Sequence, residues 1–368
     1  MNAPLLLTDA MTRAAPPRAS VVDGLSAAID AVAERGAATH RFLTYGWFAA
    51  AVSAYGGHPR TLLVEQGDVP VLAMPLVGLG PRQARLVTVP GSYWPFRSFP
   101  VADAGPSVAA AALEALAAEA NGVRLGPIYD GDPGGEALLA AARAGGWAVL
   151  DRFVAQSWLL DMGALRTEGT WPRGSTLRKN RFHEKHLGEH GALDWRFVTG
   201  EDWPAAFDDL AAVEEASWIA ARTDGSDAKF TRTGHGAFWR AAAADPVVAR
   251  MLRAAVLTID GKPAAFSFDM DAGDLKYAIA NSYDPAVGKH SPGKLLQYRN
   301  LVDALDRGIT RVDWGAGDSG YKQTIGADKG PAIRDWLLLR PGLPAVLGRL
   351  ARGLWRRSGN PETTTATD

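Results

Sequence analysis

The chain has 368 residues, 47% of them hydrophobic, which is enough apolar material for two globular domains of ordinary size. It carries 39 Lys and Arg residues against 40 Asp and Glu residues, so no net positive field would attract nucleic acid. Cysteine is absent, which excludes disulfides, thiolate metal ligands and a cysteine nucleophile, and fits a reducing compartment.

Residues 1–20 are rich in Ala and Pro and are expected to be flexible. They contain no basic stretch followed by a signal-like apolar run, and no stretch of the chain approaches the roughly 20 apolar residues that span a bilayer. We therefore expect a soluble cytoplasmic protein. The residues indicate no oligomeric state.

The segment 21–163 is predicted to form a first domain of helices and strands. A helix at 44–56 precedes three apolar strands, and a helix, a strand, a second helix and a long strand follow. The expected strands and later helices are 60–67, 69–80, 84–91, 106–121, 122–130, 134–146 and 147–162. A charged, basic junction at 164–190 comes next, which is either a solvated connecting helix or part of a groove between domains.

The segment 191–342 is predicted to form a second domain with a similar order of elements. Its strands at 251–260, 262–271 and 274–284 are divided by Asp260-Gly261 and Ala272-Gly273, and Asp-Gly between apolar runs indicates a hairpin. The other expected elements are a strand at 192–200, helices at 203–221, 235–245, 291–306 and 319–326, and strands at 310–315 and 333–341. This order predicts an α/β fold of the α+β kind, a mixed sheet with helices on both faces, built twice.

The helix expected after residue 290 begins with Ser291, Pro292 and Gly293. Serine is a good N-cap, proline suits the first helical position, and glycine lets a ligand approach the main chain. Free N–H groups and the positive end of the helix dipole favour phosphate or carboxylate. The residues that flank this start and would add positive charge are Lys289, His290 and Lys294. Ser-Pro at a helix start is also common as a purely structural feature, so both interpretations stay open.

The strands on either side of this helix end in features that favour separation. The later strand ends in Gly315-Ala316-Gly317, and small residues at neighbouring strand ends allow the strands to splay. Main-chain groups left unpaired could then bind an extended ligand as an extra strand would. The pantetheine arm and pyrophosphate of coenzyme A have that shape.

These motifs, with the apolar strands at 251–280, "YDP" at 283–285, "SPGKLL" at 291–296 and "RGITRVDWGAGDSGYKQTIG" at 307–326, resemble the GNAT acyltransferase superfamily. The resemblance covers about 165–340 and is strongest to the CelD/BcsL-type, FemAB-like acetyltransferases associated with cellulose and exopolysaccharide biosynthesis. It implies two tandem GNAT-like domains, with acetyl-CoA or another acyl-CoA bound by the second. The helix at 106–121 in the first domain lacks the Gly and the basic flank, so no CoA site is expected there.

Acyl transfer needs an oxyanion donor, a base for the acceptor and an acid for the departing thiolate. Main-chain N–H groups of Asn281, Ser282 and Tyr283 are candidates to polarise the thioester carbonyl. Tyr321 is the candidate thiolate acid by resemblance, with packing as its alternative. Asp318 is the better base candidate, although Asp before Ser-Gly is also an ordinary N-cap.

The donor site is completed by glycines and one further lysine. Gly315 and Gly317 would open the slot, and Lys322 would bind phosphate or an acidic acceptor unless it is a plain surface lysine. Asp313, inside the strand, is expected to cap or pair structurally.

The acceptor site is predicted at the domain junction. Arg178 and Arg181 match the Ser-x-x-Arg-x-x-Arg pattern of the resembled family and could clamp a phosphate or carboxylate, or simply face solvent. In the first domain, Tyr93, Trp94 and Arg97 belong to an aromatic cluster that suits a sugar acceptor or, equally, an interdomain core.

No metal is expected, because the neighbours of His183 and His186 are basic and would repel a cation. Residues 343–357 form a basic amphipathic helix that either contacts the inner membrane face peripherally or docks on its own domain. The tail at 358–368 is expected to be disordered.

The residues favour an acyl-CoA-dependent N- or O-acyltransferase acting on a sugar-linked or amino acceptor, with no nucleic-acid partner. Two alternatives stay open: a FemAB-like transferase that uses aminoacyl-tRNA, and a GNAT-fold binding protein with a degenerate active site.

Overall fold

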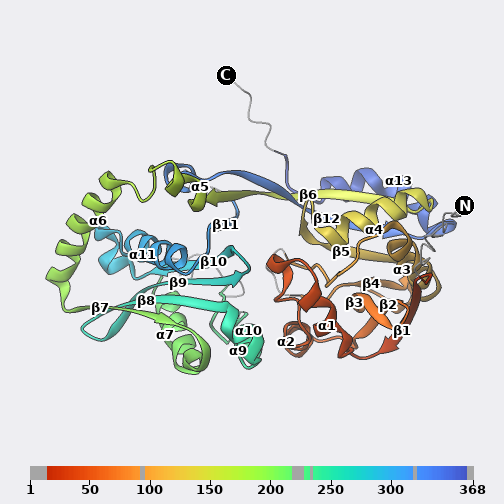
Figure 1. Ribbon diagram of the computed structural model, residues 1–368, viewed down its shortest axis with the longest axis horizontal. Coiled ribbons are helices and arrows are strands. Elements are labelled where there is room, and N and C mark those ends of the chain that lie inside the picture. The colour runs from red at the N-terminus through yellow and green to blue at the C-terminus, as the bar shows by residue number, and fades with distance from the viewer. Residues whose placement is uncertain (1–14, 92–95, 218–227, 233–234, 318–320, 363–368) are drawn as a thin grey trace, which may run out of the picture.

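A computed structural model describes residues 15–91, 96–217, 228–232, 235–317 and 321–362 (Figure 1). The strands are β1 (Arg18–Asp23), β2 (Arg60–Gln66), β3 (Val69–Leu79), β4 (Leu86–Thr88), β5 (Gly122–Tyr129), β6 (Ala148–Asp161), β7 (Leu193–Val198), β8 (Leu252–Ile259), β9 (Lys262–Ala272), β10 (Leu275–Tyr283), β11 (Arg311–Ala316) and β12 (Asp328–Leu339). The helices are α1 (Ala28–Arg35), α2 (Tyr45–Tyr55), α3 (Pro106–Glu119), α4 (Pro133–Ala144), α5 (Met162–Thr167), α6 (Gly174–Leu187), α7 (Trp203–Ala216), α9 (Gly236–Ala243), α10 (Pro246–Met251), α11 (Pro292–Asp306), α12 (Tyr321–Thr324) and α13 (Leu343–Arg357).

The described strands form one mixed sheet with the order β1-β2-β3-β4-β5-β12-β6-β11-β10-β9-β8-β7. The pairs β4–β5 and β10–β11 are parallel, and the other neighbours are antiparallel. The sheet runs through two lobes that stand side by side in Figure 1, with residues 162–325 on the left. The helices cover both faces of the sheet, as the mixed pattern predicts.

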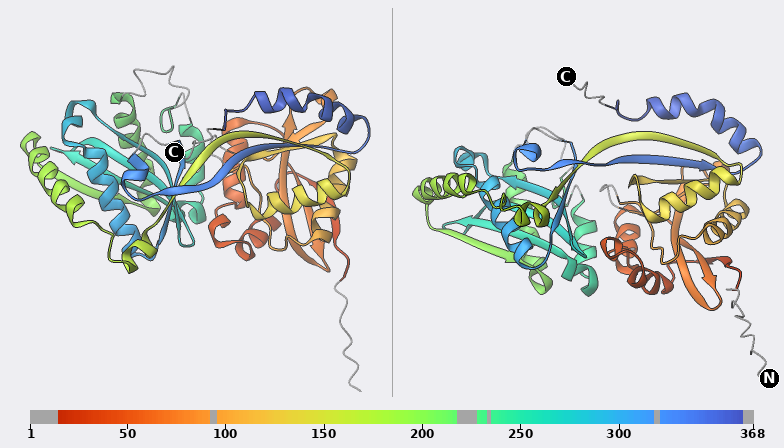
Figure 2. Two further views of the ribbon diagram at one scale, coloured as in Figure 1. Left: turned by 90° about the horizontal axis from the view of Figure 1, so that it is seen from above. Right: turned by 45° about the horizontal axis from the view of Figure 1, so that its top comes forward.

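The two lobes exchange strands. β12 follows the second lobe in sequence, yet Ile333–Leu339 pairs with β5 of the first lobe. β6 in turn belongs to the first half of the sequence, and its last residues pair with β11 of the second lobe. Figure 2 shows β6 and β12 lying together across both lobes. The domain boundaries predicted at 163 and 191 stay a prediction. Sheet pairing joins strands on either side of them.

A buried carboxylate fixes this exchange. Asp335 of β12 is fully buried and accepts hydrogen bonds from Arg124 of β5 at 2.7 Å and from Arg152 of β6 at 2.5 Å. A buried carboxylate is tolerated when it is paired in this way, and loss of one partner is costly. The pairing therefore ties three adjacent strands together.

Aromatic side chains from both lobes make one shared core. Trp47 of α2 packs edge-on against Phe238 of α9, and Phe96 contacts Tyr277 of β10 with ring centroids 4.5 Å apart. The Tyr277 hydroxyl donates to the carbonyl of Thr39 at 2.8 Å. Phe96 thus belongs to the interdomain core. For this member of the aromatic cluster, the structure agrees with the core interpretation and not with the sugar-binding groove.

The predicted strands and helices are present at the described positions, and the junction contains α6. One expectation at the N-terminus is wrong in part, because β1 begins at Arg18, inside the segment expected to be flexible, and pairs with β2. α1 and α10 were not predicted, and both are short, with 8 and 6 residues. Of the helices that the structure describes, none is long and apolar enough to cross a membrane.

Candidate functional site

β10 and β11 part after a short stretch of pairing. They are in register only from Leu275 to Tyr277 against Arg311 to Asp313, whereas β10 continues to Tyr283 and β11 to Ala316. The sequence prediction that neighbouring strand ends splay is therefore confirmed in the geometry.

Two irregularities explain why the strands diverge at that point. The register of β10 on β9 shifts between Ala278 and Ala280, so Ile279 is an extra residue. The register of β11 on β6 shifts between Asp313 and Ala316, where Gly315 has a φ of 63°. Bulges of this kind bend a strand and increase its twist. Each bulge lies within two residues of the last paired residue, so the two strands bend away from their shared edge.

The Asp313 carboxylate stabilises the bend in β11. It is buried and accepts a hydrogen bond from the N–H of Gly315 at 2.7 Å. Burial raises its pKa to about 6, although hydrogen bonds from Gly315 and Tyr129 and the charge of Lys322 lower it. Asp313 therefore makes a structural contact, as expected, and its partner is the main-chain amide of Gly315.

The gap between the strands is a cleft of about 380 Å³. One wall is the free edge of β10, the second is Trp314 of β11, and the third is the first turns of α11. The lining residues are Ala278, Ile279, Ala280, Asn281, Tyr283, Gly293, Lys294, Gln297, Trp314 and Lys322. The cleft follows the part of β10 that has no partner on the β11 side, which suits an extended ligand with amide groups.

The start of α11 differs from the prediction in its capping. Ser291 has left-handed backbone angles, with φ 53° and ψ 47°, and its side chain makes no capping hydrogen bond. Its carbonyl instead accepts the N–H groups of Lys294 and Leu295, each at 3.1 Å. The expectation of a serine side-chain cap is wrong, because Ser291 does not have the extended backbone angles from which an N-cap hydroxyl reaches the N2 or N3 amide.

Gly293 is required by packing of strand against helix. A Cβ atom there would lie 2.9 Å from Asn281 Oδ1 and 3.1 Å from Tyr283 Cδ1. The Asn281 amide also donates to the Gly293 carbonyl at 3.4 Å. The glycine therefore brings β10 and α11 together at the mouth of the cleft, in addition to any approach by a ligand.

Ser282 points to the other face of the sheet. It pairs in register with Phe266, its side chain is buried, and its hydroxyl has no hydrogen-bond partner among the described residues. Its side chain is not part of the cleft lining, so a role in donor binding would use its main chain.

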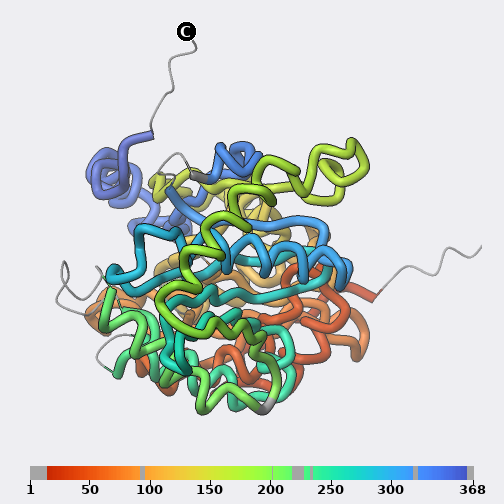
Figure 3. The backbone as a smooth tube through the Cα atoms, turned by 90° about the vertical axis from the view of Figure 1, so that its left-hand side faces the viewer, coloured from red at the N-terminus to blue at the C-terminus, as the bar shows by residue number. Residues whose placement is uncertain are grey.

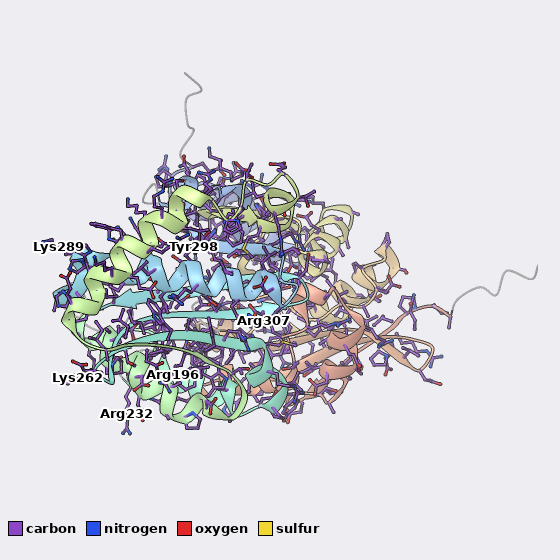
Figure 4. All side chains as sticks on the ribbon, turned by 60° about the vertical axis from the view of Figure 1, so that its left-hand side comes forward. Arg196, Arg232, Lys262, Lys289, Tyr298 and Arg307 are labelled. Carbon is purple, nitrogen blue, oxygen red and sulfur yellow. The ribbon has the colours of Figure 1, made fainter. Side chains whose placement is uncertain are left out.

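A positively charged rim surrounds the start of α11. Lys289 and Lys294 are exposed, and the His290 ring lies 5.2 Å from that of His190 and 6.0 Å from that of His186. Burial, and after it the charge of Lys179, lowers the pKa of the neighbouring His183. Figure 4 shows Lys289 at the end of the molecule where α11 begins, with Arg307 at the opposite end of the helix. The rim favours an anion at this end of the cleft.

Lys322 lines the cleft but contacts the main chain. Its ammonium donates to the carbonyls of Trp314, Ala316 and Gly315 at 2.7, 3.0 and 3.2 Å. These carbonyls lie on the part of β11 that has separated from β10, so the lysine replaces donors that a neighbouring strand would supply. Binding of phosphate or of an acidic acceptor by Lys322 stays a prediction.

The acceptor candidates that the structure describes, Arg97, Arg178 and Arg181, do not line the cleft. Figure 3 shows α6 crossing α11, and Arg178 is exposed on α6. Arg181 lines a different groove of about 520 Å³ between α6 and α11, which Trp195 and Tyr298 also line. Arg97 is half-buried in the first lobe, where burial and the charge of Arg124 lower its pKa.

Several candidates fall outside the described part of the chain. Tyr93, Trp94 and Asp318 lie outside the described residues, and for Tyr321 only the backbone, which begins α12, is described. Gly317 has a φ of 71° and follows the end of β11. Among the described residues, no group of three or more His, Asp or Glu side chains is arranged to hold a metal ion.

Gln297, Trp314, Ala278 and Ala280 line the cleft without having been predicted. Gln297 follows Gly293 by four residues, so helical spacing from the Ser-Pro-Gly start was a usable signal. The sequence gives no such spacing signal for Ala278 and Ala280, because their place in the cleft depends on the bulge at Ile279.

The comparisons with known proteins agree with this geometry. Residues 174–323 match the family model described as an acetyltransferase (GNAT) domain. No curated protein compared with the chain matches it significantly. The second lobe thus resembles a GNAT acetyltransferase domain over these residues.

Solved structures extend the likeness over both lobes. FemX superposes with a TM-score of 0.58 at 12% identity, covering 90% of this chain and 100% of that one. A conserved protein of unknown function from Bacteroides thetaiotaomicron gives 0.56 at 12% identity, covering 87% and 100%. The C-terminal domain of a protein from Agrobacterium fabrum described as a lysylphosphatidylglycerol synthetase gives 0.51 at 16% identity, covering 90% and 98%. At such identities the likeness concerns the fold alone, and the predicted mixed α/β fold with two GNAT-like domains is confirmed.

Proposed function

We propose that the protein is an acyltransferase that uses acetyl-CoA or another acyl-CoA as donor. The observation that supports this proposal is the separation of β10 and β11 beyond Tyr277 and Asp313, into a cleft that leads to the start of α11. An acyl-CoA needs an extended slot for its pantetheine arm and a cationic end for its phosphates, and the cleft offers both.

In this proposal the pantetheine arm lies along the free edge of β10. Its amide groups would pair with main-chain groups of Ala278 to Asn281, as an added strand would. The pyrophosphate would lie at the first turn of α11, within reach of Lys289 and Lys294. The fixed carbonyl contacts of Lys322 would hold β11 away from the arm.

The transfer itself requires few groups. The acceptor nitrogen or oxygen attacks the thioester carbonyl carbon, the C–S bond breaks, and the CoA thiolate takes a proton. Main-chain N–H groups on the free edge of β10 would stabilise the oxyanion. Tyr321 as the thiolate acid, Asp318 as the base and Asn281 as a polar contact remain hypotheses that follow from the sequence.

For the acceptor we propose a sugar-linked or amino compound of cell-envelope or exopolysaccharide synthesis, handled at the cytoplasmic side as in the CelD/BcsL-type enzymes that the sequence resembles. Tyr93, Trp94, Arg97, Arg178 and Arg181 remain the candidate acceptor residues.

A second donor class is aminoacyl-tRNA, as in FemAB-like transferases. The exposed cations Arg178, Lys179 and Arg181 on α6 favour it, because a nucleic-acid backbone would bind them. The cleft itself does not distinguish the two donors, since both end in an activated acyl group.

Thermal unfolding with each donor separates these readings. Acetyl-CoA at about 100 times its Kd should stabilise the folded protein by about 2.7 kcal/mol and raise its Tm by several degrees. Ala278→Phe, which fills the cleft, should abolish that rise, and Ala31→Phe on the exposed face of α1 is the matched control. No rise at millimolar acetyl-CoA, together with protection by charged tRNA, would replace the proposal by its alternative.

A further inference from the structure

The C-terminal helix α13 lies on the outer surface of the first lobe, against β6 and β12 (Figures 1 and 2). The face that it turns toward the sheet is small: Ala345 and Gly348 are buried, and a Cβ atom at Gly348 would collide with Leu339. Trp355 completes this contact, with the Arg152 guanidinium 4.4 Å from its ring centroid. The helix is therefore held in place without use of its large aliphatic side chains.

Those aliphatic side chains point away from the protein. They recur at spacings of three, four, seven and eleven residues from the first, which places them along one helical stripe. Their exposed fractions are 70% for Leu343, 50% for Val346, 56% for Leu347, 79% for Leu350 and 72% for Leu354. An amphipathic helix that docks on its own domain through its apolar face would bury this stripe. α13 docks through its small residues instead, and docking does not explain the exposed leucines.

The flanks of the stripe are cationic. The arginines near it are Arg340, Arg349, Arg352, Arg356 and Arg357, and no Asp or Glu occurs between residues 340 and 361. Arg349 and Arg352 donate to the carbonyls of Gly146 and Val149 at the side of the helix, and Arg356 pairs with Asp151 at 2.8 Å. The guanidinium groups thus lie between the apolar stripe and the body of the lobe, at the level where lipid headgroups would lie.

We propose that this stripe binds an anionic membrane surface. The leucines would enter the boundary between headgroups and acyl chains, and the arginines would meet lipid phosphates. Charge decides against a second copy of the chain as the occupant, because a symmetric pairing of stripes would bring the arginines of both copies together. The inference does not depend on the identity of the acyl donor.

Cosedimentation of the full chain with vesicles tests the proposal. The wild type should bind vesicles of phosphatidylglycerol and phosphatidylcholine at least tenfold better than vesicles of phosphatidylcholine alone. The double variant Leu347→Glu/Leu350→Glu should lose at least tenfold of that binding. The control Val69→Glu/Val247→Glu, at exposed aliphatic positions of β3 and α10, should bind as the wild type does.

Unchanged Tm and unchanged acetyl-CoA stabilisation in the Leu347→Glu/Leu350→Glu variant would show that the variant is folded and that the donor site is separate. Equal binding to both vesicle types, binding that survives the double substitution, or absence of vesicle binding would each overturn the proposal. A dimer in light scattering that the double substitution disperses would assign the stripe to a second copy and overturn it as well.

Discussion

Replacement of Asp313 by asparagine tests how the bend in β11 is held. The Asp313 pKa is raised from 3.8 to about 6 by burial, so the folded state favours the neutral carboxyl. The difference of about 2 pH units corresponds to about 3 kcal/mol that ionisation of Asp313 costs the folded protein near neutral pH. Because the folded-state pKa is raised, the stability of the neutral form is fully present below the unfolded pKa and is lost as the pH rises through 6.

Asp313→Asn should remove this cost, since the amide oxygen can still accept the N–H of Gly315. At pH 7.5 the variant should gain up to about 3 kcal/mol in the free energy of unfolding, and at pH 4 it should gain little or nothing. Urea denaturation of both proteins at the two pH values measures the difference. An equal effect at pH 4 and pH 7.5 would refute the argument, because it would mean that the charge of Asp313 does not oppose folding.

Three further substitutions test the site and the strand exchange. Gly315→Ala should cost about 1 kcal/mol in stability and weaken acetyl-CoA binding, because alanine is strained at a φ of 63°; titration calorimetry that finds unchanged affinity would contradict the role of the bulge. Lys322→Met should lower both the Tm and the affinity for acetyl-CoA, since three carbonyls lose their donor; an affinity equal to the wild type would speak against the lysine as a support of the cleft. Asp335→Asn should cost about 3–5 kcal/mol in urea unfolding, because two arginines lose their buried counter-charge, and a loss below 1 kcal/mol would contradict that pairing.

Much of the fold could be predicted because it depends on local patterns. The Asp260-Gly261 hairpin is confirmed: both residues have positive φ, 49° and 75°, and they join β8 to β9. The same holds for the start of α11 after Ser291 and for the small residues at the end of β11. Turn chemistry and periodicity need only neighbouring residues, so one sequence reveals them.

Features that depend on distant contacts could not be predicted. The pairing of β12 with β5 joins residues about 210 positions apart, and nothing in either strand specifies the partner. The bulge at Ile279 in the pairing of β10 with β9, and the left-handed conformation of Ser291, are also not described by local propensity. For the same reason Arg178 and Arg181 were assigned to the acceptor by resemblance, while the structure places Arg181 in a separate groove.

The central claim is that an acyl-CoA lies along the free edge of β10 with its phosphates at the start of α11. Amide hydrogen exchange with and without acetyl-CoA tests it most directly, because an added strand-like ligand would protect the main-chain groups that the strands leave open. We expect slower exchange over 278–281 and at Gly293 in the presence of acetyl-CoA. Exchange that acetyl-CoA leaves unchanged in these segments, while protecting another part of the chain, would contradict the claim.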